Sequence, residues 1–128
     1  MGVGDSVLIV DDEEQIQNVL KQFLGLHSIS AISEASGRDA MEALEKTAQV
    51  GLILLDLRLP DCNGSELASR IGERTENRIP VLVMSGNPDL EEMRFPECVV
   101  GTIRKPFDFT ELLEKVSLYC GNAPTRTP

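Results

Sequence analysis

Short apolar runs recur along the chain, and each is separated from the next by a more polar segment. Five of these runs have the length of a strand: residues 6–10, 28–35, 52–55, 80–84 and 99–103. Most show no polar alternation, as expected for strands that are covered on both faces of a parallel sheet. The second run mixes isoleucines with serines, so we expect it at a partly exposed edge.

The segments between the strands have the period of amphipathic helices. After the first strand, apolar residues at i, i+3, i+4, i+7 and i+8 share one helix face: Ile16, Val19, Leu20, Phe23 and Leu24. Three further helices are predicted to begin at capping residues that stand three positions before an acid, namely Ser36, Asn63 and Asp108. Helices are therefore expected after the first, second, third and fifth strands.

The helix predicted between the fourth and fifth strands is short. Asn87-Pro88 places a capping side chain before a proline at the first helical position. Pro96 ends the segment, because proline cannot continue a helix and disfavours helical dihedrals at the preceding residue.

Five strands that alternate with five helices predict an α/β fold. Strand–helix–strand connections are right-handed, so they build a parallel sheet with helices on both faces. The length of 128 residues suits one domain. We expect that domain over residues 5–121 and a flexible tail over residues 122–128, which contain two prolines and no core residue.

Composition and charge argue against several classes of function. No apolar run approaches the roughly 18 residues of a membrane span, and no secretory signal pattern begins the chain, so we expect a cytoplasmic protein without membrane insertion. A net charge of −9 disfavours direct nucleic-acid binding, which depends on lysine and arginine. Three cysteines without metal-ligand spacing suit free thiols.

Polar residues follow the apolar runs at their carboxyl ends. Asp11 and Asp12 follow the first run, Asp56 the third, Ser85 the fourth, and Lys105 lies just beyond the fifth. In an open parallel sheet these ends lie at one edge, where ligands bind. We therefore expect three acids, a hydroxyl and an amine to converge.

This set of groups predicts phosphoryl chemistry. Three crowded carboxylates repel one another unless a cation lies between them, and a site of oxygen ligands suits Mg²⁺. The hydroxyl of Ser85 and the ammonium of Lys105 suit the oxygens of an anionic phosphoryl group. A carboxylate can act as the nucleophile, and Asp56 is the best placed to do so.

The chain resembles the receiver domains of two-component response regulators over roughly residues 5–121. The resemblance rests on the order and spacing of four motifs: Val10-Asp11-Asp12, Leu55-Asp56-Leu57-Arg58-Leu59-Pro60 with Gly64, Met84-Ser85-Gly86, and Lys105-Pro106-Phe107. It implies a flavodoxin-like, doubly wound (βα)5 sandwich with a five-stranded parallel sheet in the order 2-1-3-4-5.

The resemblance also implies a mechanism and partners. Asp56 would accept a phosphoryl group from a histidine kinase or a histidine phosphotransfer domain, and the domain would catalyse its own phosphorylation and dephosphorylation without being a conventional enzyme. Mg²⁺, or Mn²⁺ in its place, would be held by Asp11, Asp12, Asp56 and the carbonyl of Arg58. Ser85 and Lys105 would bind phosphoryl oxygens. A downstream effector or a fused output domain would receive the signal.

Two features depart from the family pattern. Receivers often have an aromatic residue three positions before the lysine, where this chain has Thr102. The segment between Ser85 and Lys105 is short and contains Pro96, so the fourth helix is expected to be abbreviated or irregular. That helix, the last strand and the last helix form the usual signalling face. The resemblance further implies a cis peptide at Lys105-Pro106.

Three other functions remain open at this point. A pseudo-receiver would bind proteins without control by phosphorylation; the two departures motivate this alternative, whereas the complete set of acids argues against it. A phosphatase of the haloacid dehalogenase type also forms an aspartyl phosphate, but it has an acid two residues after the nucleophile, where this chain has Arg58. A flavin-binding protein would need a phosphate-binding loop after the first strand, where Asp11 and Asp12 would repel a phosphate.

Overall fold

Strands and helices alternate along the chain in a computed structural model that describes residues 6–47 and 49–120. These residues form β1 (Ser6–Val10), α1 (Glu14–Leu26), β2 (Ser30–Glu34), α2 (Gly37–Lys46), β3 (Val50–Asp56), α3 (Gly64–Thr75), β4 (Val81–Ser85), the 3₁₀ turn η1 (Leu90–Glu92), β5 (Val99–Arg104) and α4 (Phe109–Tyr119). The predicted domain ends at residues 5 and 121 and the predicted tail lie outside the described residues.

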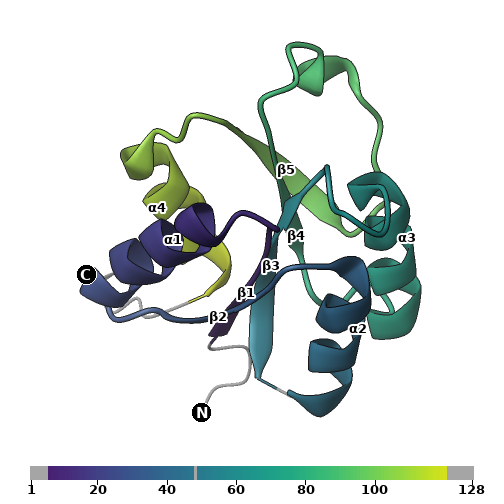
Figure 1. Cartoon of the computed structure of the whole chain (residues 1–128), viewed down its shortest axis with the longest axis horizontal. Coiled ribbons are helices and arrows are strands. Elements are labelled where there is room, and N and C mark those ends of the chain that lie inside the picture. Colours follow the sequence, from purple (N-terminus) through teal and green to yellow (C-terminus); the bar gives the residue numbers. More distant parts are fainter. Residues whose placement is uncertain (1–5, 48, 121–128) are drawn as a thin grey trace.

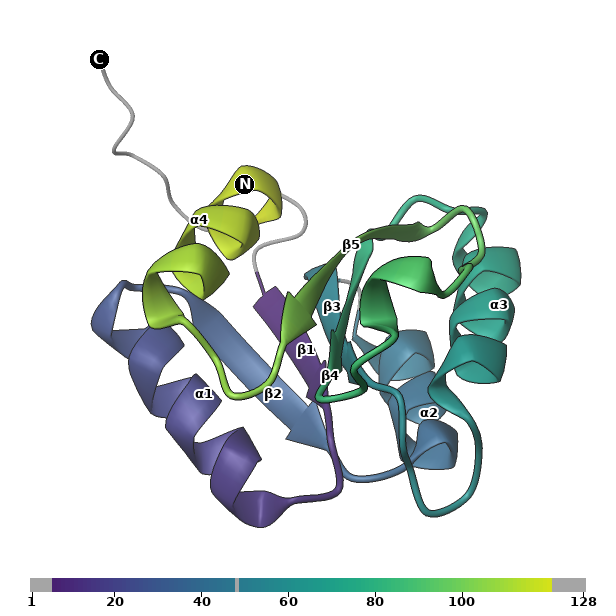
Figure 2. The same ribbon diagram turned by 90° about the horizontal axis from the view of Figure 1, so that it is seen from above.

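All five strands pair in parallel in one sheet, in the order β2-β1-β3-β4-β5. Helices α1 and α4 cover one face of the sheet, and α2 and α3 cover the other (Figure 1). The same three layers are visible from above in Figure 2. The predicted α/β class and strand order are therefore confirmed, and β2 lies at an edge as expected.

The two faces of the sheet carry separate cores, because successive side chains of a strand point to opposite faces. On β3, Leu52 and Leu54 pack with α1 and α4, whereas Ile53 and Leu55 pack with α2 and α3. All four side chains are fully buried. The aliphatic run that predicted a strand covered on both faces thus fills both cores.

The predicted capping residues begin three of the helices. Ser36 accepts a hydrogen bond from the backbone N–H of Asp39, and Asn63 accepts from Ser65 and Glu66. The carboxylate of Asp108 accepts from the two N–H groups at the second and third positions of α4. Each side chain satisfies donors that have no partner within the helix.

The fourth connection contains a 3₁₀ turn in place of an α-helix, so the shortening expected there is complete. The side-chain oxygen of Asn87 accepts a hydrogen bond from the N–H of Asp89 at 2.8 Å, and the backbone carbonyl of Asn87 accepts one from the N–H of Leu90 at 3.1 Å. The backbone continues in extended form from Met93, and residues 93–96 are not helical. The turn closes too tightly and too close to Pro96 for an α-helix to develop.

Other expectations have mixed outcomes. Val19 is 45% exposed, because it lies at the margin of the apolar stripe of α1 and the buried Leu20 and Leu24 lie at its centre. Cys62 and Cys98 are not in disulfides, as expected. Within residues 6–47 and 49–120, no helix is both long enough and apolar enough to cross a bilayer.

Substitution of Gly64 tests how closely the start of α3 packs against the end of β3. A Cβ at this position would lie 2.6 Å from the carbonyl oxygen of Asp56 and 2.6 Å from Cα of Leu57, and neither backbone atom can move away easily. We expect Gly64→Ala to lower the free energy of unfolding by about 2–3 kcal/mol, the cost of overpacking, as measured by urea denaturation.

The matched control for this prediction is Gly25→Ala near the end of α1, where a Cβ would meet nothing within 4 Å. It should be neutral or raise stability by about 0.5 kcal/mol, because alanine favours the helix over glycine. Equal effects of the two substitutions would contradict the close approach at Gly64.

Candidate functional site

The carboxyl ends of β1, β3, β4 and β5 bring the predicted site residues to one edge of the sheet. Carboxylate oxygens of Asp11, Asp12 and Asp56 lie within 4.8 Å of one another. Asp11 is fully buried, Asp56 is 8% exposed and Ser85 is 7% exposed, whereas Asp12 is exposed. The convergence predicted from the strand ends is therefore present, and the chemical roles of these residues stay predictions.

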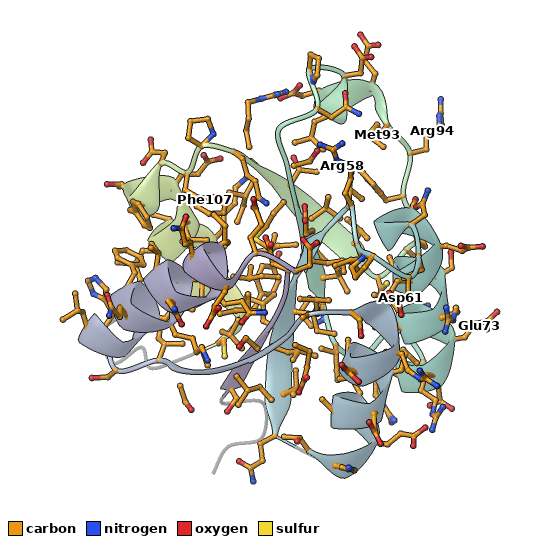
Figure 3. All side chains as sticks on the ribbon, viewed as in Figure 1. Arg58, Asp61, Glu73, Met93, Arg94 and Phe107 are labelled. Carbon is orange, nitrogen blue, oxygen red and sulfur yellow. The ribbon has the colours of Figure 1, made fainter. Side chains whose placement is uncertain are left out.

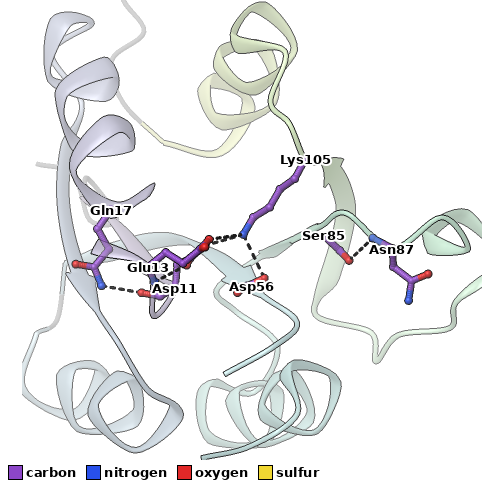
Figure 4. A network of polar contacts seen from close by, with 7 residues as sticks. All are labelled: Asp11, Glu13, Gln17, Asp56, Ser85, Asn87 and Lys105. Atoms are coloured by element: carbon purple, nitrogen blue, oxygen red, sulfur yellow. Dashed lines mark hydrogen bonds and ion pairs between the residues drawn. The ribbon is translucent and has the colours of Figure 1, made fainter. Parts of the chain in front are cut away.

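Lys105 connects two of the carboxylates. Its Nζ lies 3.0 Å from Oδ2 of Asp11 and 3.4 Å from Oδ1 of Asp56 (Figure 4). Oε1 of Glu13 lies farther away, at 3.9 Å. The Lys105-Pro106 peptide is cis, as the family resemblance implied. One ammonium thus offsets part of the negative charge that the ends of β1 and β3 bring together.

The environment shifts the pKa values of Asp56 and Lys105. Burial raises the pKa of Asp56, and the charge of Asp11 adds to that effect, whereas Lys105 and the backbone N–H of Arg58 oppose it. Burial alone would lower the pKa of Lys105, but its hydrogen bonds and ion pairs with Asp11 and Asp56 outweigh burial and raise it. Lys105 therefore stays charged beside a carboxylate that is costly to ionise.

Asp11 is held by its own backbone neighbours and by α1. Its Oδ1 accepts a hydrogen bond from the N–H of Glu13 at 2.9 Å, and its carbonyl accepts from Nε2 of Gln17 at 2.7 Å. Ser33 of β2 in turn donates to Oε1 of Gln17 at 3.3 Å. The apolar pattern that predicted α1 does not include Gln17 and gives no sign of this contact. The proximity of Gln17 to Leu20 and Leu24 on a helical wheel could have indicated a position facing the sheet.

Ser85 and Arg58 occupy the other walls of the site. The Ser85 hydroxyl accepts a hydrogen bond from the N–H of Asn87 at 3.0 Å. Arg58 lies in the loop after β3 and pairs with Asn63 in an isolated antiparallel bridge. The N–H of Gly64 donates to the carbonyl of Leu57 at 2.9 Å and closes the same loop. The loop thus folds back directly against Asp56.

A cleft of about 1120 Å³ opens over these residues. Asp56, Ser85 and Lys105 line its polar part, and the apolar part includes Leu57 and Met93. Figure 3 shows Arg58 and Met93 beside the space between the β3–α3 loop and the η1 segment, whereas Arg94 points away from it. The acidic site is therefore accessible from solvent through this cleft.

The donor set fits a hard divalent cation. The side chains of Asp11, Asp12 and Asp56 offer carboxylate oxygens, and a single ammonium leaves excess negative charge among these three carboxylates. Mg²⁺ prefers such oxygen ligands and keeps several waters, for which the exposed side of Asp12 and the open cleft leave room.

Comparison with known sequences identifies relatives of the whole domain. Residues 7–117 match the family described as response regulator receiver domain. The transcriptional regulatory protein SrrA of Staphylococcus aureus is 31% identical over 114 residues, which make up 89% of this chain and 47% of SrrA. The chain thus spans about half the length of the curated relatives that it matches.

Solved structures share the fold. A response regulator receiver protein from Pseudomonas putida superposes with a TM-score of 0.79 at 28% identity, covering 91% of this chain and 98% of that protein. The response regulator TrrA of Thermotoga maritima, solved in complex with Mg²⁺-BeF, has a TM-score of 0.79 at 24% identity and covers 88% and 96%. At that identity, the likeness to TrrA shows the fold alone.

The raised pKa of Asp56 predicts a pH-dependent stability. A carboxyl whose pKa is higher in the folded state favours folding below its unfolded pKa of about 4, and this contribution is lost as pH rises through the folded pKa. Without divalent cations, Asp56→Asn should therefore be more stable than the wild type at pH 7, and the difference should shrink as pH falls towards 4. Urea denaturation in EDTA across this pH range measures it.

Asp61→Asn serves as a control of opposite sign. The N–H groups of Gly37 and Arg38 donate to the Asp61 carboxylate and lower its pKa. A lowered pKa stabilises the fold above the unfolded pKa, and the contribution is lost as pH falls through the folded pKa. Asp61→Asn should thus be less stable at neutral pH. If the stability gained by Asp56→Asn instead grew as the pH fell, burial of Asp56 could not be the cause of the gain.

Proposed function

The chain belongs to the response regulator receiver domain family of two-component signalling, and from that premise we propose that Asp56 accepts a phosphoryl group from a phosphohistidine donor. The observation that carries the proposal is the contact of Lys105 with both Asp11 and Asp56 at the carboxyl edge of the sheet. The carboxylates of Asp12 and Asp56 and the ammonium of Lys105 line one open cleft, and Lys105 also contacts the buried Asp11.

The proposed step forms one bond and breaks another. A carboxylate oxygen of Asp56 attacks the phosphorus of a phosphohistidine, and the bond between phosphorus and nitrogen breaks while its electron pair stays on the imidazole. Negative charge develops on the phosphoryl oxygens. Lys105 pairs with one of these oxygens, and the Ser85 hydroxyl donates to another. Both groups already lie in the cleft beside Asp56.

Asp11, Asp12, Asp56 and the backbone carbonyl of Arg58 would hold Mg²⁺, and Mn²⁺ could replace it. When bound, the cation supplies positive charge to the acids and to the phosphoryl oxygens. The backbone N–H of Glu13 donates to the Asp11 carboxylate, and the side-chain amide of Gln17 donates to the Asp11 carbonyl, so both contacts keep Asp11 at the edge of the sheet. Asp12 contributes an exposed carboxylate that needs little rearrangement to accept a ligand.

A histidine kinase or a histidine phosphotransfer domain would donate the phosphoryl group, and an effector protein or a fused output domain would receive the signal. We propose η1, β5 and α4 as the signalling face and residues 5–121 as the receiver domain. The net charge of −9 favours output through a protein over direct binding to nucleic acid. We further propose that the domain acts in the cytoplasm and hydrolyses its own aspartyl phosphate.

Thr102 and the 3₁₀ turn favour one alternative, a pseudo-receiver that binds partners without phosphorylation. Mg²⁺ affinity separates the two functions. Calorimetric titration should detect binding at millimolar Mg²⁺, and Asp12→Asn should weaken it about tenfold, because one carboxylate ligand is lost. Glu14→Gln, which removes an exposed acid from the first turn of α1, should leave affinity unchanged. A wild type that binds no Mg²⁺ would favour the pseudo-receiver.

Phosphorylation itself can be tested with a small donor. Incubation with acetyl phosphate and Mg²⁺ should add one phosphoryl group, detected by intact-protein mass spectrometry as an acid-labile adduct. Asp56→Asn should abolish the adduct, because the amide is a poor nucleophile. Asp61→Asn, five residues along the same loop, should retain it. Equal labelling of the wild type and Asp56→Asn would place the acceptor elsewhere.

A further inference from the structure

Two adjacent cationic residues at the end of β5 reach different parts of the domain. Lys105 contacts the acids of the site, whereas Arg104 reaches across to the η1 segment. Nη1 of Arg104 donates to the carbonyl of Asn87 at 2.9 Å, and Nη2 donates to Oε1 of Glu91 at 2.5 Å. Arg104 therefore ties β5 to the turn that follows β4.

Asn87 links Arg104 to Ser85. Its N–H donates to the Ser85 hydroxyl at 3.0 Å, and its carbonyl accepts from Arg104 and from the N–H of Leu90. Ser85 also lies opposite Arg104 in the register of β4 and β5. A chain of hydrogen bonds therefore runs from the cleft beside Asp56 to the exposed carboxylate of Glu91.

The chain of hydrogen bonds has two possible arrangements, which differ in the orientation of the Ser85 side chain. In Figure 4 the hydroxyl points towards Asn87 and away from Asp56. To donate to a phosphoryl group on Asp56, the side chain must turn, and the N–H of Asn87 then loses its acceptor. A guanidinium directs its donors in a fixed plane, so a shift of the Asn87 peptide weakens its bond to Arg104.

We propose that the Arg104–Glu91 pair holds the turn after β4 in the arrangement that it has when Asp56 is not phosphorylated. Phosphorylation of Asp56 would change this arrangement, and the pair would transmit the change to η1. This inference rests on the proposed function. Thr102 and Arg104 are two residues apart on β5 and share a face, while Ile103 between them is buried in the core with α1 and α4. From this face, Arg104 bridges to η1 through Glu91.

The proposed coupling between the phosphoryl group on Asp56 and the contacts of Arg104 acts in both directions. If a phosphoryl group weakens the Arg104 contacts, then those contacts oppose binding of a phosphoryl group by the same factor. Loss of either partner should therefore tighten the binding of a phosphoryl analogue. A merely structural role predicts the opposite, because a disordered turn would position Ser85 less well.

The experiment measures the affinity for beryllofluoride in the presence of Mg²⁺ by calorimetry. Arg104→Gln and Glu91→Gln should each tighten binding about threefold, the size of a partly exposed ion pair, and the double variant should add little further. Arg74→Gln is the matched control: it removes an exposed pair with Glu45 between α3 and α2, far from the cleft, and should change nothing. Thermal denaturation verifies that each variant folds.

Amide hydrogen exchange provides a second measurement. Beryllofluoride should speed exchange of the Asn87 and Leu90 amides in the wild type, and in Arg104→Gln these amides should exchange fast without ligand. Unchanged or weaker beryllofluoride binding in both single variants would overturn the coupling while leaving the phosphoacceptor site intact. A wild type that binds no beryllofluoride would overturn the proposed function and the coupling together.

Discussion

An ammonium group shared by two buried carboxylates is the interaction on which the site depends. Burying Asp11 and Asp56 without a positive partner would cost several kcal/mol, and Lys105 supplies that partner from a strand end 94 and 49 residues away along the chain. The compensation is partial, because Asp12 adds a third carboxylate to the cluster. The remaining negative charge supports the proposal that a divalent cation and, with it, a phosphoryl group bind at this edge of the sheet.

The parallel sheet makes this concentration of charge possible. Its central strands β1, β3 and β4 are mostly aliphatic on both faces, so the polar residues of the site appear where these strands end, at the same edge of the sheet. The loop after β3 then has to return directly across Asp56 into α3. The absence of a side chain at Gly64 allows this return, since a Cβ there would lie within 2.6 Å of backbone on β3 and the loop. Core packing and site geometry are therefore linked at one residue.

The connection between β4 and β5 distinguishes this domain from the pattern that its sequence resembles. A single 3₁₀ turn replaces a helix, and hydrogen bonds from Arg104 anchor the turn to the sheet. A short segment held by few polar contacts can shift at a lower cost than a helix packed along the sheet. The response to chemistry at Asp56 is thus expected where packing is least extensive, which is why the proposed coupling involves Arg104 and η1.

The sequence by itself determined the strands, the helix caps and the residues that meet at the sheet edge, because aliphatic runs, capping patterns and strand-end acids are local signals. It also indicated that the fourth connection would be short. Only the tertiary structure decided how the site is supported: the bond from Gln17 to the Asp11 carbonyl, the capping of α2 by Asp61, and the reach of Arg104 to Asn87 and Glu91. These contacts join elements that are distant in sequence, and their partners depend on which strands are neighbours and on the exact rotation of each helix against the sheet. Val19, at the margin of its helical stripe, is exposed for the same reason.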